Sequence, residues 1–357
     1  MTKKTKQKLF LIGTFPPPVT GMATTTESIY ERIKEHQVQV IKINTSPRDL
    51  RRSTYSRLSR LPHFFKAWIK LAKEAQPKNK LYVPISGELG QIYDLVTIAI
   101  AKLKGMQCFI SHHSFAYLDK PNLLTKILFH LAGRETLHIT RCKRMKDMLA
   151  KQYKINNMLI LTNLDLRFQP SRTITTLTKI GYISNITRDK GGHIILELAY
   201  AIRENNIPIK LIVAGPCYET ELSKNLKRAE KEGVLEWIGA VYDNDKKYFW
   251  NNIDAFVFPT QYVNEAEPRV VWESISHGIP VISYERGCIS EQIKNSGIII
   301  SQQENFVDAA IAILKKWSND RASFEIYTNA GQEYYKRMQN IVNTQWEEFI
   351  HYIEKEQ

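Results

Sequence analysis

The chain has 357 residues, 43% of them hydrophobic and 24% charged, which is typical of a globular protein long enough for two domains. No apolar run approaches the roughly 20 residues that a membrane-spanning helix needs, so an integral membrane protein is not expected. The net charge of +14 is uneven, because residues 1–175 hold 30 of the 50 lysines and arginines but 11 of the 36 acidic residues. This basic first half implies an anionic partner, which could be nucleic acid, a membrane surface or a phosphate-bearing acceptor.

The first 165 residues alternate between strand-like and helix-like segments. Apolar runs predict strands over residues 8–14, 38–43, 81–85 and 108–111. Helical periodicity predicts a helix from near Thr24, after the first strand, and another over residues 88–104, after the third. Three prolines, Pro16 to Pro18, forbid a helix directly after the first strand, and Gly21 beyond them permits close approach of a ligand to the backbone. His113 follows the fourth strand, at the strand end where such folds bind ligands, and His112 is the second choice there.

A basic segment spans residues 48–73. Its apolar residues at positions 61, 64, 65, 68 and 69 fit one face of a helix. A basic helix with aromatic residues can lie on an anionic bilayer. The alternative is that the apolar face packs on the domain while the charges are solvated, and both can hold if the arginines lie at the rim.

A polar stretch from Gln169 to Thr178 is expected to be a linker, and a second α/β alternation follows it. Strands are expected over residues 179–184, 209–214, 255–258, 279–283 and 298–300. The first of these leads into a loop that carries Asn185, Arg188 and Lys190, and the second ends at Gly215. In an α/β sheet these positions lie where ligands bind.

The stretch from Val263 to Glu273 runs from a loop into a helix. Pro268 suits the first turn of that helix, where its missing N–H costs nothing. The N–H groups of Arg269 and Val270 would then be free to hold an anion, helped by the helix dipole. Glu265 on the loop could accept hydrogen bonds from sugar or ribose hydroxyls, as could Glu273 inside the helix. The alternative is a strand–loop–helix unit whose acids are simply solvated.

The two glutamates are seven residues apart, with Pro268 three residues after the first and Ser-x-x-Gly-x-Pro after the second. This pattern resembles the signature of glycosyltransferase family 4, and the resemblance covers nearly the whole chain. It implies an α/β fold of the GT-B type, with two Rossmann-like domains facing a cleft and a C-terminal helix crossing back to the first domain. The domains expected are an acceptor-binding domain (1–170), a nucleotide-sugar-binding domain (171–335) and the terminal helix (336–357).

The resemblance also implies roles for single residues. Lys190 matches the lysine of the family's Arg-x4-Lys-Gly motif, whose cations face the donor diphosphate; the arginine position is Asn185, so either Asn185 or Arg188 replaces it. His113 matches a histidine near the acceptor and the transferred sugar, and Gly21 one of two glycines in the first loop. The candidates for catalysis are Lys190, Glu265 and His113. Those for donor binding are Asn185, Arg188, Glu273, Gly21, Gly215, Pro268, Arg269 and Val270.

The chemistry follows from the charge that develops when a sugar–diphosphate bond breaks. The β-phosphate becomes negative and the sugar oxocarbenium-like, and each donor aimed at such a charge is worth roughly 3–4 kcal/mol. Glu265 is expected at sugar hydroxyls and Glu273 at the ribose. The segment Asp243-Asn244-Asp245 looks like a metal-binding Asp-x-Asp pair but is interpreted as the cap of a helix, so no metal site is expected. No residue is an evident nucleophile, which favours same-face attack by the acceptor hydroxyl.

The implied activity is that of a retaining, metal-independent glycosyltransferase of the hexosyltransferase type. It would move a sugar from a UDP- or GDP-linked donor to a glycan or lipid-diphosphate-linked saccharide in the biosynthesis of O-antigen, capsule or exopolysaccharide. The nucleotide sugar is a co-substrate, and no cofactor is implied. The expected location is the cytoplasm, peripherally at the inner face of the plasma membrane, whose anionic surface would attract the basic domain.

Two other function classes compete with this interpretation. A nucleotide-sugar epimerase of the GT-B fold would turn over the sugar nucleotide with no acceptor present. A nucleic-acid-binding protein is suggested by the charge and would bind duplex in a salt-dependent way, but the sequence has no recognition motif of that kind. Donor base, sugar, acceptor, linkage and oligomeric state are left open, and the resemblance favours the transferase.

Overall fold

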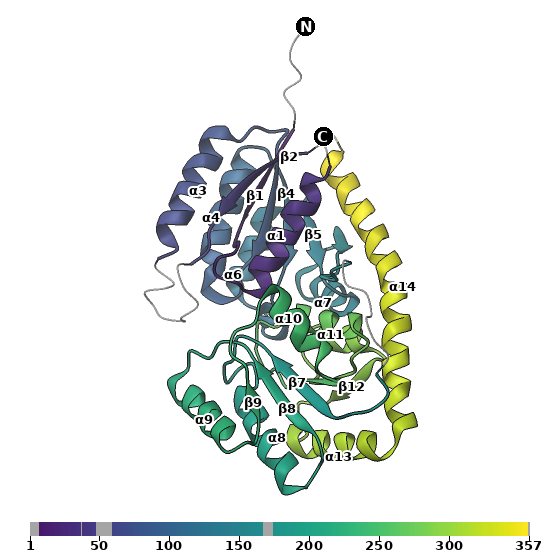
Figure 1. Cartoon of the computed structure of the whole chain (residues 1–357). Helices are drawn as coiled ribbons and strands as arrows, with labels where there is room; N and C mark the ends of the chain where they lie inside the picture. The colour runs from purple at the N-terminus through teal and green to yellow at the C-terminus, as the bar shows by residue number, and fades with distance from the viewer. Residues whose placement is uncertain (1–6, 37, 48–58, 167–173, 356–357) are drawn as a thin grey trace. The chain divides into compact units, whose positions relative to one another are not determined.

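The computed structural model describes residues 7–36, 38–47, 59–166 and 174–355, which form two compact units (Figure 1). Unit 1 comprises residues 1–163 and 342–357, and unit 2 comprises residues 164–341. Each unit contains a six-stranded sheet in which all neighbouring strands are parallel. The strands are short apolar runs because helices cover a parallel sheet on both faces.

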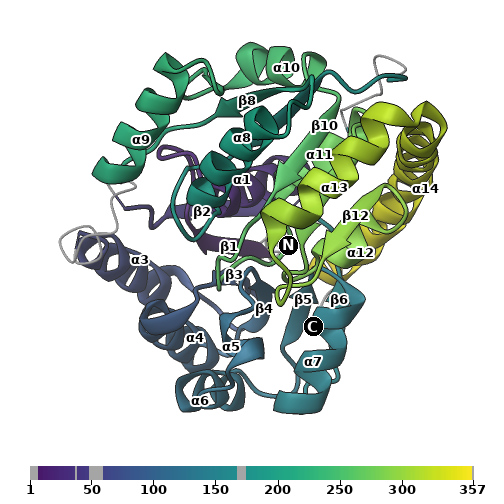
Figure 2. The ribbon, with the colours of Figure 1, turned by 90° about the horizontal axis from the view of Figure 1, so that it is seen from below.

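The sheet of unit 1 has the strand order β2-β1-β3-β4-β5-β6. Its strands are β1 (Lys8–Gly13), β2 (Gln39–Asn44), β3 (Lys80–Ile85), β4 (Gln107–His112), β5 (Leu137–Thr140) and β6 (Met158–Ile160). The helices are α1 (Gly21–Lys34), α3 (Leu61–Glu74), α4 (Gln91–Leu103), α5 (Ala116–Asp119), α6 (Leu123–Ala132) and α7 (Lys143–Tyr153), with the 3-10 helix η1 (Glu88–Gly90) before α4. Helices α3, α4 and α6 lie side by side as one layer (Figure 2).

The first helix begins earlier than the sequence predicts. The side chain of Thr20 accepts a hydrogen bond from the N–H of Ala23, so it caps α1 and the helix starts at Gly21 rather than near Thr24. Gly21 is therefore the first residue of a helix and not part of a loop. Of the basic segment, residues 48–58 lie outside the described residues, and the rest forms α3.

The sheet of unit 2 has the order β12-β11-β10-β7-β8-β9. Its strands are β7 (Lys179–Ile183), β8 (Lys210–Ala214), β9 (Glu236–Trp237), β10 (Ala255–Phe258), β11 (Val281–Tyr284) and β12 (Gly297–Ile300). Its helices are α8 (Gly192–Glu204), α9 (Thr220–Lys231), α10 (Asp243–Asn251), α11 (Arg269–Ser276), α12 (Ile289–Ile293) and α13 (Phe306–Asn319). Of the expected linker, residues 169–173 lie outside the described residues, while Ile174 and Leu177 beyond them are buried.

The last helix, α14 (Arg321–Glu354), has 34 residues and contributes to both units. Within unit 1, the ring of Phe349 packs on those of Tyr82 and Phe109, on the sheet. The buried Lys80 donates hydrogen bonds to the carbonyls of Tyr352, Ile353 and Lys355 and so satisfies the otherwise unpaired end of the helix. None of the described helices combines the length and apolarity needed to cross a membrane.

Candidate functional site

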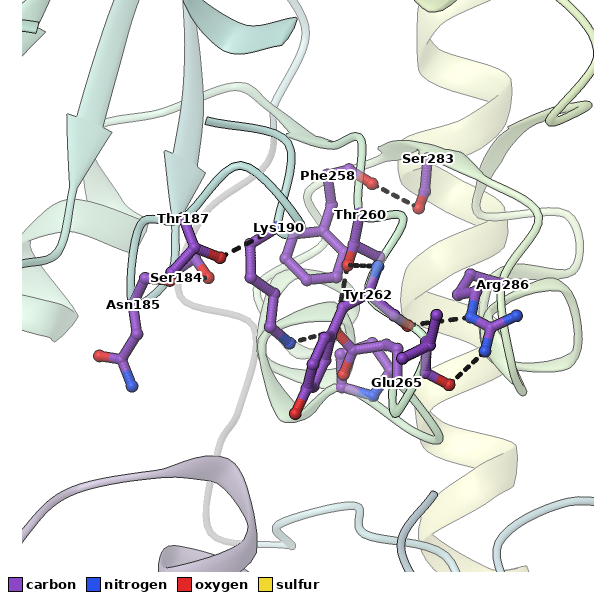
Figure 3. Close-up of polar contacts among 12 residues, drawn as sticks. Ser184, Asn185, Thr187, Lys190, Phe258, Thr260, Tyr262, Glu265, Ser283 and Arg286 are labelled. Carbon is purple, nitrogen blue, oxygen red and sulfur yellow. Dashed lines mark hydrogen bonds and ion pairs between the residues drawn. The ribbon is translucent and has the colours of Figure 1, made fainter. Parts of the chain in front are cut away.

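The centre of the site in unit 2 is an ion pair between Lys190 and Glu265 (Figure 3). Lys190 lies in the loop after β7 and Glu265 in the loop after β10, and these two strands are hydrogen-bonded neighbours. The Glu265 carboxylate oxygen that meets Lys190 also accepts a hydrogen bond from Thr260 Oγ1 at 3.3 Å, and the Lys190 Nζ lies 4.6 Å from the centroid of the Tyr262 ring. The two loops thus place a cation and a carboxylate together at the carboxyl edge of the sheet.

Backbone contacts fix the loop that carries Lys190. The N–H of Lys190 donates to Thr187 Oγ1 at 3.2 Å, and its carbonyl accepts from the Tyr182 hydroxyl at 3.0 Å. Gly191 has a φ of +85°, and a Cβ at this position would overlap the carbonyl of Pro259. Glycine is therefore needed for the two loops to approach this closely.

A second set of contacts holds the loop that carries Glu265, and the sequence analysis missed it. Arg286 donates to the carbonyls of Tyr262, at 3.0 Å, and Val263. Gly287 has a φ of +56°, and a Cβ there would clash with the carbonyls of Glu265 and Ala266. The signal available in the sequence was the Arg-Gly pair just after the strand that ends near residue 284.

Glu273 forms the second ion pair of the site. Its carboxylate oxygens lie 2.8 and 2.7 Å from the Nζ of Lys246 on α10. Glu273 is 4% exposed and Glu265 is 7% exposed, so the interpretation of the two acids as simply solvated is wrong. Lys246 was also missed, because an isolated lysine in a surface helix carries no sequence signal for a buried partner.

Helix α11 begins one residue later than the sequence predicts. Pro268 has a ψ of 124° and is the N-cap, so the first helical residue is Arg269 and not the proline. The carbonyl of Pro268 accepts hydrogen bonds from the N–H of Val271 and from Gln292 Nε2. The Arg269 side chain is 3.3 Å from Asp165 Oδ2, so its guanidinium is ion-paired within unit 2. The backbone N–H of Val270 lies in the first turn of this helix, as expected for an anion-binding end.

The remaining donor-site candidates of unit 2 are Asn185, Arg188 and Gly215. Asn185 is exposed and points away from the pair in Figure 3. Arg188 is also exposed, and its N–H faces the carboxylate of Glu219 at 3.2 Å. Gly215 has a φ of +118°, and its N–H donates to the carbonyl of Gly239. The structure therefore brings Lys190 and Glu265 together, whereas Asn185 and Arg188 are exposed side chains of the loop that carries Lys190.

In unit 1, His113 lies at the end of β4, as the sequence predicts. Its Nε2 is 2.6 Å from Nη2 of Arg141 and 3.1 Å from Oγ of Ser111. Burial, followed by the nearby Arg141 and His112, holds the pKa of His113 well below its ordinary value. His112, the second choice, is completely buried against Tyr117 and has a structural role. Arg141 was missed by the sequence analysis.

The structure also shows the surroundings of Gly21 and of the Asp243–Asp245 segment. A Cβ at Gly21 would meet no atom within 4 Å, so the start of α1 is open there. Asp243, Asn244 and Asp245 form the first turn of α10 after the N-cap Tyr242, so their interpretation as a loop that caps the helix is wrong. Among the described residues, no group of three or more His, Cys, Asp or Glu side chains could hold a metal ion.

Comparison with known proteins finds a family resemblance in the second unit. Residues 165–336 match the family model described as "Glycosyl transferases group 1". The capsular polysaccharide biosynthesis glycosyltransferase CapM of Staphylococcus aureus is 27% identical over 175 residues, which cover 47% of this chain and 44% of CapM. The match thus spans less than half the length of that curated relative.

Solved structures resemble the chain over almost its full length. HepE of Anabaena, crystallised with UDP, has a TM-score of 0.68 at 15% identity, covering 96% of this chain and 99% of HepE. The sucrose-phosphate synthase of Thermosynechococcus elongatus has a TM-score of 0.70 at 15% identity, covering 98% and 99%. WaaG, a glycosyltransferase involved in lipopolysaccharide biosynthesis, has a TM-score of 0.63 at 11% identity, covering 97% and 99%. The predicted fold class, a GT-B fold built from two Rossmann-like domains, is confirmed, and the residues that match the group 1 model, 165–336, lie within its second unit.

Proposed function

We propose that the chain is a retaining glycosyltransferase of family 4 that moves a sugar from a nucleoside diphosphate sugar to a saccharide acceptor in the biosynthesis of a surface polysaccharide. The observation that carries the proposal is the Lys190–Glu265 pair at the strand ends of unit 2. It lies inside the part of the chain that matches group 1 glycosyl transferases. HepE has been crystallised with UDP, with UDP and glucose, and with UDP-glucose, which supports a donor of the same class here.

The pair can exchange its internal contact for contacts with the donor. The side chains of Lys190 and Glu265 are 19% and 9% exposed, so the pair lies at the edge of the solvent rather than in the core. A diphosphate has more negative charge than one carboxylate and would draw the ammonium of Lys190 toward it. Glu265 would then be left to accept hydrogen bonds from hydroxyls of the transferred sugar. The ammonium would stabilise the charge that builds up on the leaving phosphate, an effect worth roughly 3–4 kcal/mol per donor in comparable sites.

The second ion pair holds the other end of the donor. Lys246 orients the buried carboxylate of Glu273, whose two oxygens could accept hydrogen bonds from the ribose hydroxyls. The amides in the first turn of α11, Val270 among them, add a partial positive charge for the diphosphate. Because Lys190 and these amides supply positive charge at the leaving group, we propose that transfer does not require a metal.

Retention of the anomeric configuration follows from the positions proposed for the acids. With the donor bound, Glu265 would be occupied by Thr260 and the sugar hydroxyls, so it is not proposed as a nucleophile. The acceptor hydroxyl then attacks from the face that the diphosphate leaves, and an α-linked donor gives an α-linked product. A covalent glycosyl-enzyme trapped on any side chain would contradict this step.

An anionic membrane surface is the proposed location of the acceptor, as a saccharide on a lipid diphosphate at the inner face of the plasma membrane. The layer of α3, α4 and α6 supports this membrane location. Helix α3 exposes a row of apolar side chains, with Phe65 61% exposed, and helix α6 exposes a second row, with Leu123 71% exposed. Four exposed lysines accompany the rows, whereas these two helices contain one acidic residue, Glu74. The apolar rows are Leu61, Phe65 and Ile69 on α3 and Leu123, Ile127 and Leu131 on α6, and the lysines are Lys66, Lys70, Lys73 and Lys126.

Such a face matches a bilayer that is apolar beneath an anionic surface. Sedimentation with vesicles of phosphatidylglycerol and phosphatidylcholine tests the match directly. We expect the chain to bind in proportion to the anionic lipid and to be released by salt. Equal partition to vesicles of phosphatidylcholine alone would contradict the proposed role of the lysines.

The transfer reaction is tested with a panel of UDP- and GDP-sugars. Thermal shift selects the donor, and mass spectrometry then follows transfer to lipid-linked saccharides in excess EDTA. We expect nucleoside diphosphate release that requires an acceptor. Turnover of the sugar nucleotide with no acceptor would instead indicate an epimerase, and loss of transfer in EDTA would contradict metal independence.

A further inference from the structure

Arg141 directly follows β5, and its guanidinium is buried at the carboxyl edge of the sheet of unit 1, with 2% of the residue exposed. Among the described residues of this unit, no carboxylate forms an ion pair with it. A buried cation without an acid is costly unless its donors are all used. Its hydrogen bonds therefore reveal what this arginine does.

The guanidinium is shared between backbone carbonyls and the side chains at the end of β4. Its Nε donates to the carbonyl of His112 at 3.2 Å and its Nη1 to the carbonyl of Leu161 at 2.8 Å. Its Nη2 lies 2.5 Å from Oγ of Ser111 and 2.6 Å from Nε2 of His113. The two carbonyls hold the guanidinium in one orientation, in which Nη2 points at Nε2 of His113.

This contact determines the protonation state of His113. A guanidinium always carries its protons and only donates hydrogen bonds, so Nε2 of His113 has to accept. A neutral imidazole that accepts at one nitrogen carries its proton on the other. A charged imidazolium would point its Nε2–H at an N–H of the guanidinium and bring two positive charges into contact, which is unfavourable.

The other titratable groups around His113 do not favour its charged form over the neutral one. His112 and His138, on β4 and β5, are completely or almost completely buried, and burial lowers the pKa of His138 to about 3. The hydroxyl of Tyr82, on β3, is close to Arg141, and burial raises its pKa. All three are neutral near pH 7, so no nearby anion favours a charged His113.

The opposite nitrogen of His113 is available to a ligand. The residue is partly exposed, and among the described residues no hydrogen bond reaches its Nδ1. We propose that Arg141 is a positioning residue that fixes His113 as a neutral imidazole with its proton on Nδ1, so that His113 donates a hydrogen bond to a saccharide oxygen. His113 is then a donor to the substrate and not the base that removes the proton of the acceptor hydroxyl.

The nature of the ligand, a saccharide, rests on the proposed function, whereas the state of the ring does not. The first test therefore uses the unliganded protein: nitrogen-15 NMR of the histidine rings between pH 5 and 8, with the His113 signals assigned from their loss in His113→Asn. We expect the neutral Nδ1–H form throughout this range. A titration near the ordinary pKa of about 6.5, or a proton on Nε2, would overturn the proposal even if transfer activity were found.

Substitution of Arg141 gives a second readout. In Arg141→Met, we expect a mixture of the Nδ1–H and Nε2–H forms of His113, because burial still favours the neutral ring but the donor that holds Nε2 as an acceptor is gone. Circular dichroism checks that this variant folds. If it does not, the measurement on the wild-type protein still decides the question. A folded Arg141→Met in which His113 remains in the Nδ1–H form at every pH would show that Arg141 does not position the ring.

A pair of isosteric substitutions tests the role toward the ligand. The side-chain amide of His113→Asn places an N–H close to the position of Nδ1, whereas that of His113→Gln extends to the position of Nε2. We expect His113→Asn to keep about five- to tenfold more kcat/KM than His113→Gln, the effect of one hydrogen bond of ordinary strength. Equal losses in the two variants, or a kcat that follows a group titrating near pH 6.5 in the wild-type protein, would contradict donation from Nδ1.

Discussion

The two units use the same architecture but treat buried charge differently at the ends of their strands. In unit 2, Lys190 and Lys246 each meet a glutamate near the protein surface. In unit 1, Arg141 is buried, has no acidic partner in the part of the chain that the structure describes, and donates to carbonyls and to the ring of His113. An ion pair at the surface can be exchanged for a charged ligand, whereas a buried cation that is already satisfied can only orient its neighbours. In the proposed function, unit 2 would accordingly bind the charged part of the substrate and unit 1 would present neutral donors.

The largest effect is expected from Lys190→Ala. Without the ammonium, the departing phosphate loses its main positively charged partner. We therefore expect kcat to fall about 10²- to 10³-fold, as for the loss of one preorganised donor. Steady-state kinetics with the selected donor measure the change. The matched control is Lys231→Ala, since Lys231 is exposed on α9 and should leave kcat unchanged. Equal activity of the two variants would refute the role of Lys190.

Lys246→Met should affect both the stability of unit 2 and the binding of the donor. It leaves the carboxylate of Glu273 buried without its cation, which typically costs about 3–5 kcal/mol in the free energy of unfolding. The KM for the donor should rise more than kcat falls, because the ribose is remote from the breaking bond. Denaturant unfolding and kinetics measure the two effects. Lys247→Met is the control, because Lys247 is its exposed neighbour on the same helix.

Much of the arrangement behind these predictions was visible in the sequence. The strands are apolar runs at regular spacing, so the alternation that defines the fold could be predicted, as could the strand-end positions of Lys190, Glu265 and His113. The partners of these residues could not. Lys246 lies 27 residues before Glu273, and Arg141 lies 28 residues after His113. Such pairs meet only because strand order and helix packing bring them together.

Errors at element boundaries have local causes. The side chain of Thr20 moved the start of α1 forward to Gly21, and Pro268 took the N-cap position rather than the first turn of α11. Each depends on one hydrogen bond or one backbone angle that the pattern of apolar residues does not encode. The roles of Asn185 and Arg188 remain predictions, because both side chains are exposed in the unliganded structure.

Asp94→Asn tests the treatment of buried charge in unit 1 at another buried ionisable residue. Burial raises the pKa of Asp94 to about 6 despite the hydrogen bond from Ser86 and the nearby Arg60. The folded form therefore holds its proton more tightly than the unfolded form, so wild-type stability falls as the pH rises from about 4 to about 6. The neutral asparagine should avoid this loss and stabilise the protein by up to about 3 kcal/mol at pH 8, but not at pH 4. Thermal unfolding across this range measures the effect, and an equal shift at both pH values would contradict it.

The smallest effect is expected from Phe65→Ser on the layer of α3, α4 and α6. Phe65 is mostly exposed, so its loss should leave the melting temperature within about 2 °C of the wild type. Binding to anionic vesicles should weaken by at least about tenfold, because burial of one large apolar side chain in a membrane interface contributes about 1.5–3 kcal/mol. Ile326→Ser, at an exposed apolar position of unit 2, should not change vesicle binding. Similar losses in both variants would argue against a specific face.

The most direct test of the central claim is a crystal structure of the chain with a bound nucleoside diphosphate sugar. We predict that the ammonium of Lys190 leaves Glu265 and contacts a phosphate oxygen, while Glu265 accepts hydrogen bonds from the sugar hydroxyls and Glu273 from the ribose. A donor bound elsewhere, or one bound in unit 2 with the Lys190–Glu265 pair intact and remote from the diphosphate, would contradict the proposed function.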